Sequence, residues 1–230
     1  ALYVGISNYN KFQTAEIIKI FEELHTPFVV NQPSWSLLNR WVEEDVLDSF
    51  CEEHGIGLAV FSPLSNGLLT NKYLGGPVSG ARVPADTVDA AMVERLNKLN
   101  AIASSRGQSL SQMALSWILF NSSVATVLIG ASRPEQIEEN VKCIDNLDFT
   151  YEEIKQIDDF ASSALSELGN MIMGNASKVF SSSGIGIDIT PPTLSHGEVS
   201  FTSTYAKSLC VPMVFDGGGI DLFLALKQEN

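Results

Sequence analysis

Residues 1 to 163 alternate short β-rich runs with helical stretches, and this alternation restricts the possible folds more than any other feature of the chain. The strand-like runs are LYVGIS at 2–7, FVVNQ at 28–32, GLAVFSPL at 57–64 and ATVLIG at 125–130. Helical stretches between and after them include 14–24, 43–55 and 134–144. Strands separated by covering helices are typical of parallel βα units. The sequence therefore predicts four parallel strands, with a long Gly- and Pro-rich loop at 74–86 after the third.

From about Ile185 the pattern changes, because strand-like runs follow one another without helices between them. Alternating apolar residues at 220–226 and the turn sequence DGGG at 216–219 predict an antiparallel meander. A helical spacing of apolar residues runs from Ile154 to Met171 and crosses residue 163 without a break. We therefore predict two segments, 1–160 and 161–230, joined inside one helix near 158–164.

Charge and cysteine content limit the partners and the compartment. The chain has 27 acidic and 14 basic side chains and a formal net charge of −13, which would repel nucleic acid and anionic membranes. No apolar run approaches the roughly 18 residues that a membrane span needs. Three scattered cysteines form no metal spacing and no paired framework, so we expect packing residues, no metal site and a cytoplasmic location. Because the chain begins at Ala1, inside a strand-like run, we expect it to be part of something longer.

Several helix starts carry capping residues, and one of them could bind an anion. Ser109 with Gln112, Ser132 with Glu135 and Thr150 with Glu153 each fit a capping box. A helix that opens at Ser132 would present free N–H groups to an anion, and Arg133 would add a charged fork. The alternative is that this stretch is only a helix cap and that Phe61, at the end of the third strand, is only a core residue.

The four predicted strand ends are GISN at 5–8, VVNQPS at 29–34, AVFSPL at 59–64 and IGASR at 129–133. Together with SLLNRWVE, GLLTNKYL, QMALSWIL and ASRPEQIEEN, they resemble the last four βα units of the aldo-keto reductases, especially the bacterial glyceraldehyde-phosphate reductases and potassium-channel β subunits. The resemblance covers residues 1–160. It implies an α/β fold, half of a (βα)8 barrel, and oxidoreductase ancestry with an NADP(H) site.

By that resemblance, thirteen residues would hold the cofactor. Those near the nicotinamide would be Ser7, Asn8 and Gln32, which hydrogen-bond its carboxamide, and Phe61, which stacks on its ring. Those along the pyrophosphate would be Ser62, Leu64, Gly67 and Lys72. Those around the adenosine and its 2′-phosphate would be Ser132, Arg133, Gln136, Glu139 and Asn140. The family's catalytic Asp, Tyr, Lys and His lie on its first four βα units, which this chain lacks, so we expect a cofactor platform without carbonyl reduction.

Residues 163–230 resemble a different family, the CheX and CheC phosphatases that act on phosphorylated CheY. The matching stretches are SALSELGNMIMGNASKV at 163–179, IDITPPTLSHGE at 187–198 and the closing alternating strand, about half of such a protein. The resemblance implies an α+β segment with a long helix and antiparallel strands. It also implies that Glu167 anchors the helix on CheY and that Asn170 orients the attacking water. Alternatively, both are ordinary exposed helix residues.

Three functions therefore remain open at the level of sequence. The first is a nicotinamide-cofactor binding module, and the second is a phosphatase acting on phosphorylated CheY through Glu167 and Asn170. The third is a chimera in which both sites are inherited and inactive. Whether the chain is an enzyme is left undecided. Because a half-barrel has open strand edges, a homodimer is a further expectation.

Overall fold

The computed structural model describes residues 2–160 and the backbone of residues 208–215 and 218–225. Four strands form one sheet in the order β1-β2-β3-β4, and every neighbouring pair is parallel. The strands are β1 (Val4–Ser7), β2 (Phe28–Gln32), β3 (Gly57–Phe61) and β4 (Val124–Leu128). The prediction of four parallel strands is confirmed.

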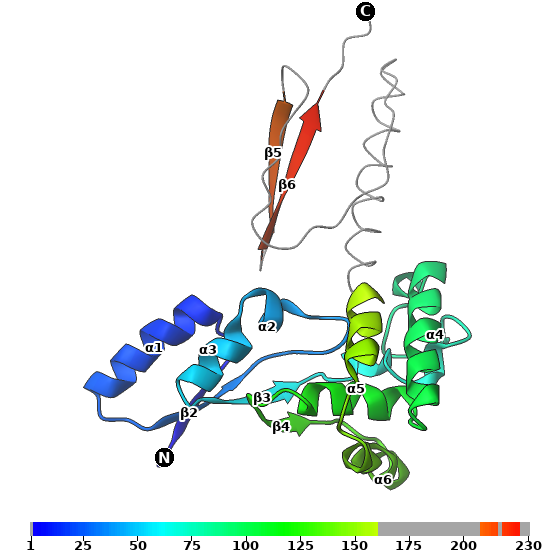
Figure 1. Ribbon diagram of the computed structural model, residues 1–230, viewed down its shortest axis with the longest axis horizontal. Helices are drawn as coiled ribbons and strands as arrows, with labels where there is room; N and C mark the ends of the chain where they lie inside the picture. The colour runs from blue at the N-terminus through cyan, green and yellow to red at the C-terminus, as the bar shows by residue number, and fades with distance from the viewer. Residues whose placement is uncertain (1, 161–207, 216–217, 226–230) are drawn as a thin grey trace, which may run out of the picture.

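Helices connect consecutive strands of the sheet, and one more helix follows the last strand (Figure 1). They are α1 (Lys11–Glu23), α2 (Trp41–Glu44), α3 (Leu47–Glu53), α4 (Ala90–Ser105), α5 (Leu110–Leu119) and α6 (Pro134–Val141). Helix α1 packs on β2, α3 on β3 and α5 on β4. Short 3-10 turns lie at η1 (Ser65–Gly67), η2 (Asn71–Tyr73), η3 (Ala85–Thr87) and η4 (Lys142–Asp145). Residues 151–160 are helical as well.

Side chains on the helix-covered face of the sheet form the core. Leu58 and Val60 of the central strand β3 are fully buried there. Trp35 and Trp117 meet edge to face with ring centroids 5.7 Å apart, which joins the loop after β2 to α5. Asn31 of β2 is also buried, and its Nδ2 donates to the Tyr9 carbonyl and to Thr14 Oγ1 at the start of α1. The core thus packs α1, α3 and α5 against the strand that follows each of them.

The opposite face of the sheet is more open and carries small residues. A Cβ atom at Gly57 would lie 2.8 Å from the Cβ atom of Ala125 on the neighbouring strand. Ser7, Ala125 and Leu128 are exposed, with Leu128 at 43%. In a closed barrel of eight strands this face would be the interior.

A separate hairpin occupies the carboxyl-terminal part of the described chain. Strands β5 (Ser208–Phe215) and β6 (Gly218–Ala225) pair antiparallel, and Phe215 lies opposite Gly218. This confirms the antiparallel pairing predicted for these two runs. The predicted join at 158–164 lies partly outside the described residues, and Glu167 and Asn170 lie wholly outside them.

Two local expectations were wrong. The predicted helix at 43–55 is split into α2 and α3, because Val46 takes a left-handed backbone conformation with φ of 58°. The predicted cap of Ser132 by Glu135 is replaced by one in which Gln136 is the capping partner.

Within the described residues, no helix combines the length and the apolar character that crossing a bilayer requires.

Candidate functional site

The carboxyl ends of β1 and β2 are tied together by three of the predicted cofactor residues. Ser7 Oγ donates to the Gln32 carbonyl at 2.9 Å, and the Asn8 amide donates to the same carbonyl at 3.0 Å. Asn8 Oδ1 accepts from the Ser34 amide at 3.0 Å. Asn8 can do this because it takes a left-handed conformation with φ of 56°, which asparagine tolerates better than most residues. The structure therefore brings Ser7, Asn8 and Gln32 together.

Phe61 ends β3 beside this group. Its amide donates to the Pro33 carbonyl at 3.0 Å, and its carbonyl accepts from the Trp35 amide at 3.3 Å. Across the sheet it lies opposite Leu128 of β4. Its side chain is half-buried, so part of the ring remains accessible. Phe61 thus lies between the loop that follows β2 and the end of β4.

The loop after Phe61 contains the residues expected near a pyrophosphate. Ser62 has φ of 54°, and Gly67 in η1 has φ of 95°, where a side chain would be strained. Leu64 precedes η1 and packs partly against the core. Lys72 is exposed, and its Nζ lies 5.4 Å from the centroid of the Tyr73 ring. Lys72 thus supplies one exposed cation, whereas the amides of Ser65 and Gly67 already donate to carbonyls within the loop.

The start of α6 has a different arrangement from the one predicted. Arg133 is the first residue of the turn, and Pro134 begins the helix. Gln136 Oε1 accepts from the Ser132 amide at 2.8 Å and from the Arg133 amide at 3.3 Å. Two N–H groups expected to face an anion therefore already have an internal acceptor. Ser132 and Arg133 are exposed.

Further along α6, Glu139 and Asn140 are held by the protein itself. Glu139 Oε1 accepts from Gln112 Nε2 of α5 at 2.8 Å, and its Oε2 pairs with Lys142 at 2.9 Å. Asn140 is buried, with 7% of its surface exposed. The contact with Gln112 anchors α6 on α5, so Glu139 has a structural role in addition to the one expected.

A network around the loop after β2 was not predicted from the sequence. Asn39 Nδ2 donates to Ser34 Oγ at 3.1 Å, and the Trp41 indole donates to the Ser34 carbonyl at 2.6 Å. The Ser36 and Ser65 hydroxyls lie 2.7 Å apart and connect this loop to the one after β3. The sequence gives little signal of this network, because Ser34 and Ser36 are separated by Trp35 and two leucines precede Asn39. The network holds the strand-end loops in place.

Arg40 joins the same loop to the end of the described helical region. Its guanidinium pairs with Glu43 and with Asp158, the latter at 2.7 Å, and lies 5.0 Å from the Trp117 ring. Burial opposes the charge on Arg40, but the hydrogen bonds and attraction from Glu43 and Asp158 outweigh it and raise its pKa. The helix at 151–160 is thereby attached to the strand-end side of the sheet.

Comparison with known proteins identifies the family. The model of the aldo/keto reductase family matches residues 1–162, which is most of the chain. The chain belongs to the aldo-keto reductase family. It is 43% identical to L-glyceraldehyde 3-phosphate reductase of Escherichia coli K12 over 168 residues, covering 69% of this chain and 49% of that protein. It is 35% identical to a putative voltage-gated potassium channel subunit beta of Schizosaccharomyces pombe, covering 69% of this chain and 50% of that protein.

Solved aldo-keto reductases agree with the fold. The glycerol dehydrogenase AKR11B4 from Gluconobacter oxydans has a TM-score of 0.56 at 26% identity, covering 70% of this chain and 49% of that one. The holo form of AKR11C1 from Bacillus halodurans has a TM-score of 0.53 at 26% identity, covering 69% and 50%. The chain spans about half the length of the relatives it matches. Its four parallel βα units are part of the aldo-keto reductase barrel.

A second, shorter match involves another family. The model of the CheC-like family matches residues 160–196. This range contains Glu167 and Asn170 and begins within the last residues of the aldo-keto reductase match.

Proposed function

We propose that residues 1–160 form the NADP(H)-binding half of an aldo-keto reductase-type oxidoreductase. The observation that carries the proposal is the cross-linked group of Ser7, Asn8 and Gln32, with Phe61 on the adjacent strand end. Ligands of parallel α/β folds bind where the carboxyl ends of strands meet. Ten of the thirteen residues implied by the family resemblance lie on those strand ends and the loops after them, which supports the assignment, and Gln136, Glu139 and Asn140 lie on α6.

In this proposal each part of the site has one task. Ser7, Asn8 and Gln32 orient the nicotinamide carboxamide, and Phe61 supports one face of the ring. The loop from Ser62 to Lys72 would hold the pyrophosphate. Arg133 would reach the 2′-phosphate with its guanidinium, because Gln136 already engages the amides at the start of α6. The bound cofactor would supply hydride chemistry, and these residues would supply its orientation.

The proposed module binds without reducing a carbonyl. Carbonyl reduction needs a proton donor and a polarised substrate beside the nicotinamide. Of the histidines in the described residues, His25 lies in the loop before β2 and His54 ends α3, so both are at the amino ends of strands. Neither is placed beside the nicotinamide group. A second half-barrel would have to provide the acid and the opposite wall.

Calorimetric titration with NADPH and NADH tests this assignment. We expect saturable binding that is tighter for NADPH than for NADH. An Arg133→Ala variant should weaken NADPH binding by at least about tenfold and leave NADH binding nearly unchanged, because a lost charge-assisted contact is worth about 1.5–3 kcal/mol. The matched control is Lys19→Ala, which removes an exposed cation from α1. The proposed role of Arg133 would be contradicted if Arg133→Ala weakened the binding of NADPH and NADH equally. It would also be contradicted if Lys19→Ala weakened NADPH binding as much as Arg133→Ala does.

A second candidate function concerns the remaining segment, and its support is the CheC-like match over residues 160–196. We propose that residues 161–230 form a separate unit that accelerates the loss of phosphate from phosphorylated CheY through Glu167 and Asn170. Phosphate release from CheY is measured with the parent, with Asn170→Ala and with Asn175→Ala as the control. Loss of acceleration only in Asn170→Ala supports the proposal. If the folded parent does not accelerate phosphate release from CheY, the phosphatase proposal is wrong and the chain is a chimera in which this site is inactive.

Two further proposals concern assembly and compartment. The edges of the sheet, β1 and β4, have no partner strand among the described residues. Leu2 and Tyr3 beside β1 are 84% and 64% exposed. We propose that two chains pair along these edges as a homodimer.

We also propose a cytoplasmic location, since Cys51 and Cys143 are free thiols buried in the core.

A further inference from the structure

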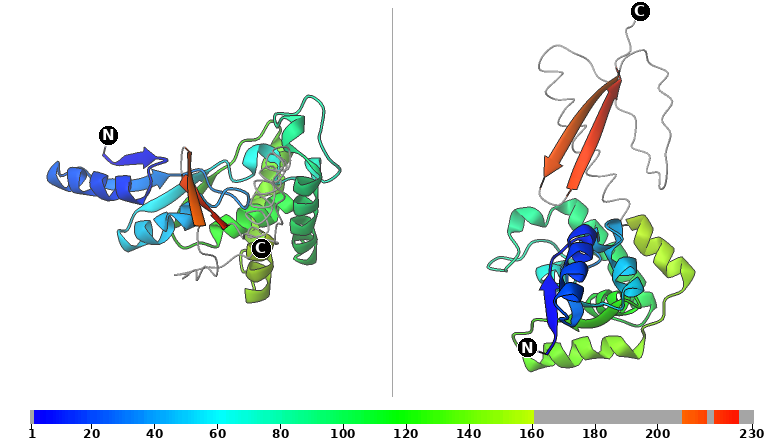
Figure 2. Two further views of the ribbon diagram at one scale, coloured as in Figure 1. Left: turned by 90° about the horizontal axis from the view of Figure 1, so that it is seen from above. Right: turned by 90° about the vertical axis from the view of Figure 1, so that its left-hand side faces the viewer.

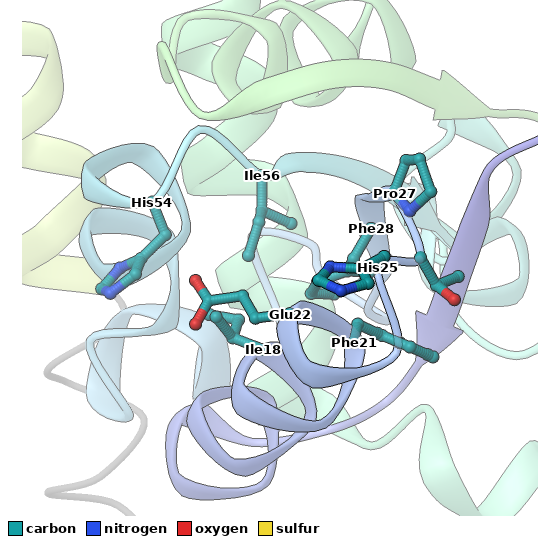
Figure 3. A pocket seen from close by; sticks show the side chains of 9 residues that line it. Ile18, Phe21, Glu22, His25, Pro27, Phe28, His54 and Ile56 are labelled. Atoms are coloured by element: carbon teal, nitrogen blue, oxygen red, sulfur yellow. The ribbon is translucent and has the colours of Figure 1, made fainter.

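A cavity of about 380 Å³ lies at the opposite end of the strands from the proposed cofactor residues. Helix α1 contributes Ile18, Phe21 and Glu22, and the segment leading into β3 contributes His54 and Ile56 (Figure 3). Phe28, the first residue of β2, also lines it, whereas Gln32 at the other end of the same strand belongs to the cofactor group. Every wall comes from the described half-barrel, so the cavity does not depend on barrel closure.

Two polar side chains of this cavity, Glu22 and His54, can accept hydrogen bonds from a ligand. Glu22 is a carboxylate and therefore accepts only. His54 Nδ1 lies 2.8 Å from the Phe50 carbonyl oxygen. Because a carbonyl oxygen can only accept a hydrogen bond, Nδ1 is the donor in this contact. In the neutral ring, Nε2 is then free to accept a hydrogen bond from a ligand. The His54 ring is held against Phe50, with centroids 4.2 Å apart. In Figure 3 the Glu22 carboxylate lies between the His54 and His25 rings.

Helix α1 adds negative potential at the same place. The carboxyl end of a helix carries a partial negative charge, which a basic residue in the last turn commonly offsets. The last turn of α1 contains no basic residue and ends in Glu22 and Glu23. None of the ion pairs between described residues involves Glu22. A cation bound here would therefore be stabilised by both the carboxylate and the helix end.

The remaining walls are apolar and aromatic. Phe21 and Phe28 lie with centroids 5.5 Å apart, and Ile18 and the buried Ile56 complete the surface. Aromatic faces attract cations and also bury apolar groups. The cavity thus combines an acceptor-rich end with an apolar wall.

Two other kinds of ligand fit less well. A metal ion is disfavoured, because no three His, Cys, Asp or Glu side chains in the described part of the chain are grouped to hold one. An anion would meet the Glu22 carboxylate, the negative end of α1 and a chain with a net charge of −13. We propose that this cavity binds a small organic amine whose ammonium group contacts Glu22 and His54 and whose aromatic or branched body packs on Phe21 and Phe28. This site is independent of the proposed cofactor site.

The test uses 2-phenylethylamine as the probe, with 2-phenylethanol and phenylacetate as neutral and anionic analogues of similar shape. Binding to the full chain is followed by shifts of backbone amide resonances during titration. We expect saturable shifts at residues 18–28 and 54–57 with the amine, and binding at least about tenfold weaker with the alcohol. Phenylacetate should cause no saturable shift.

Matched variants separate the charge of Glu22 from general charge. Glu22→Gln should weaken amine binding by about tenfold, because the charge-assisted contact is lost. Glu23→Gln removes the same charge from the neighbouring exposed residue and should change binding by less than about twofold. An Ile18→Trp variant, which fills the cavity, should abolish the shifts while the fold is retained. No saturable binding of the amine, equal binding of the amine and the alcohol, or equal effects of the two glutamine variants would overturn the proposal.

Discussion

Asn8 shows how one side chain can serve both the fold and the candidate site. Its left-handed backbone turns the chain after β1, and its Oδ1 holds the Ser34 amide of the next strand end. The sequence predicted Asn8 as a cofactor residue from the family resemblance alone. The hydrogen bond to Ser34 could not be predicted, because it depends on the register between β1 and β2.

Substitutions at Asn8 separate its two structural contributions. Asn8→Ala should destabilise the protein by about 1–2 kcal/mol, since alanine is strained at positive φ and the Ser34 amide loses its acceptor. Asn8→Gly should cost less, because glycine relieves the strain but not the lost hydrogen bond. Urea denaturation of both variants measures the difference. Equal stability of Asn8→Ala and the parent would contradict this reading of the strand end.

Cys51 gives a second prediction at the scale of single residues. It is fully buried on α3, and burial, with a smaller contribution from the Asp48 charge, raises the pKa of its thiol to about 12. At pH 8 the reactive thiolate is then only about one part in ten thousand. Iodoacetamide labelling followed by peptide mapping should leave Cys51 unmodified in the native protein and label it after denaturation. Rapid native labelling would show that α3 is not packed as described.

Among the helices, capping residues were predicted well where the partner is three residues from the cap. Ser109 with Gln112 and Thr150 with Glu153 form the expected contacts. At α6 the pattern was misleading, because Pro134 moves the helix start one residue later and makes Gln136 the partner. The break at Val46 had no signal, since neither glycine nor proline marks it.

The helix at 151–160 is attached through a buried arginine. Arg106 Nη1 pairs with Glu153 at 2.9 Å, and its guanidinium lies 3.7 Å from the centroid of the Phe149 ring. Burial alone would raise the pKa of Glu153, but hydrogen bonds from Thr150 and the pairing with Arg106 outweigh it and lower the pKa. The ionised carboxylate is therefore part of the packing of this helix.

This pairing predicts a pH dependence of stability. Because the folded pKa of Glu153 is lowered, its contribution is present above the ordinary glutamate pKa of about 4.3 and is lost as the pH falls through the folded value. Glu153→Gln should reduce stability by about 1 kcal/mol at pH 7 and by progressively less towards pH 3. The control is Glu152→Gln, an exposed neighbour. A deficit in Glu153→Gln that does not shrink on acidification would contradict the assigned role.

At the scale of the whole molecule, the described residues of the first segment form half of a barrel (Figure 2). The order and direction of its strands followed from the alternation of strand and helix, because parallel strands need covering connections. The sequence could not predict which contacts fix the strand-end loops, since these join residues far apart in the chain. The relation between this half and the CheC-like segment lies outside the described residues.

Open edges predict association between chains. Exposed parallel edges at β1 and β4 should pair with those of a second copy, so that the uncovered face of each sheet becomes interior. Light scattering across a concentration series should show a mass moving from monomer to dimer. A Thr126→Pro or Ala125→Lys change at β4 should shift the equilibrium towards monomer. A parent that stays monomeric at its highest soluble concentration would contradict this assembly.

We propose that the carboxyl ends of β1 to β4 hold a nicotinamide cofactor. Amide hydrogen exchange of the folded chain with and without NADPH tests it most directly, because the measurement both detects and locates binding. We expect slower exchange at residues 7–8, 32–36, 61–72 and 132–136, with no change at 18–28 or 54–57. A folded chain in which NADPH slows exchange nowhere, or only at the amino ends of the strands, would contradict it.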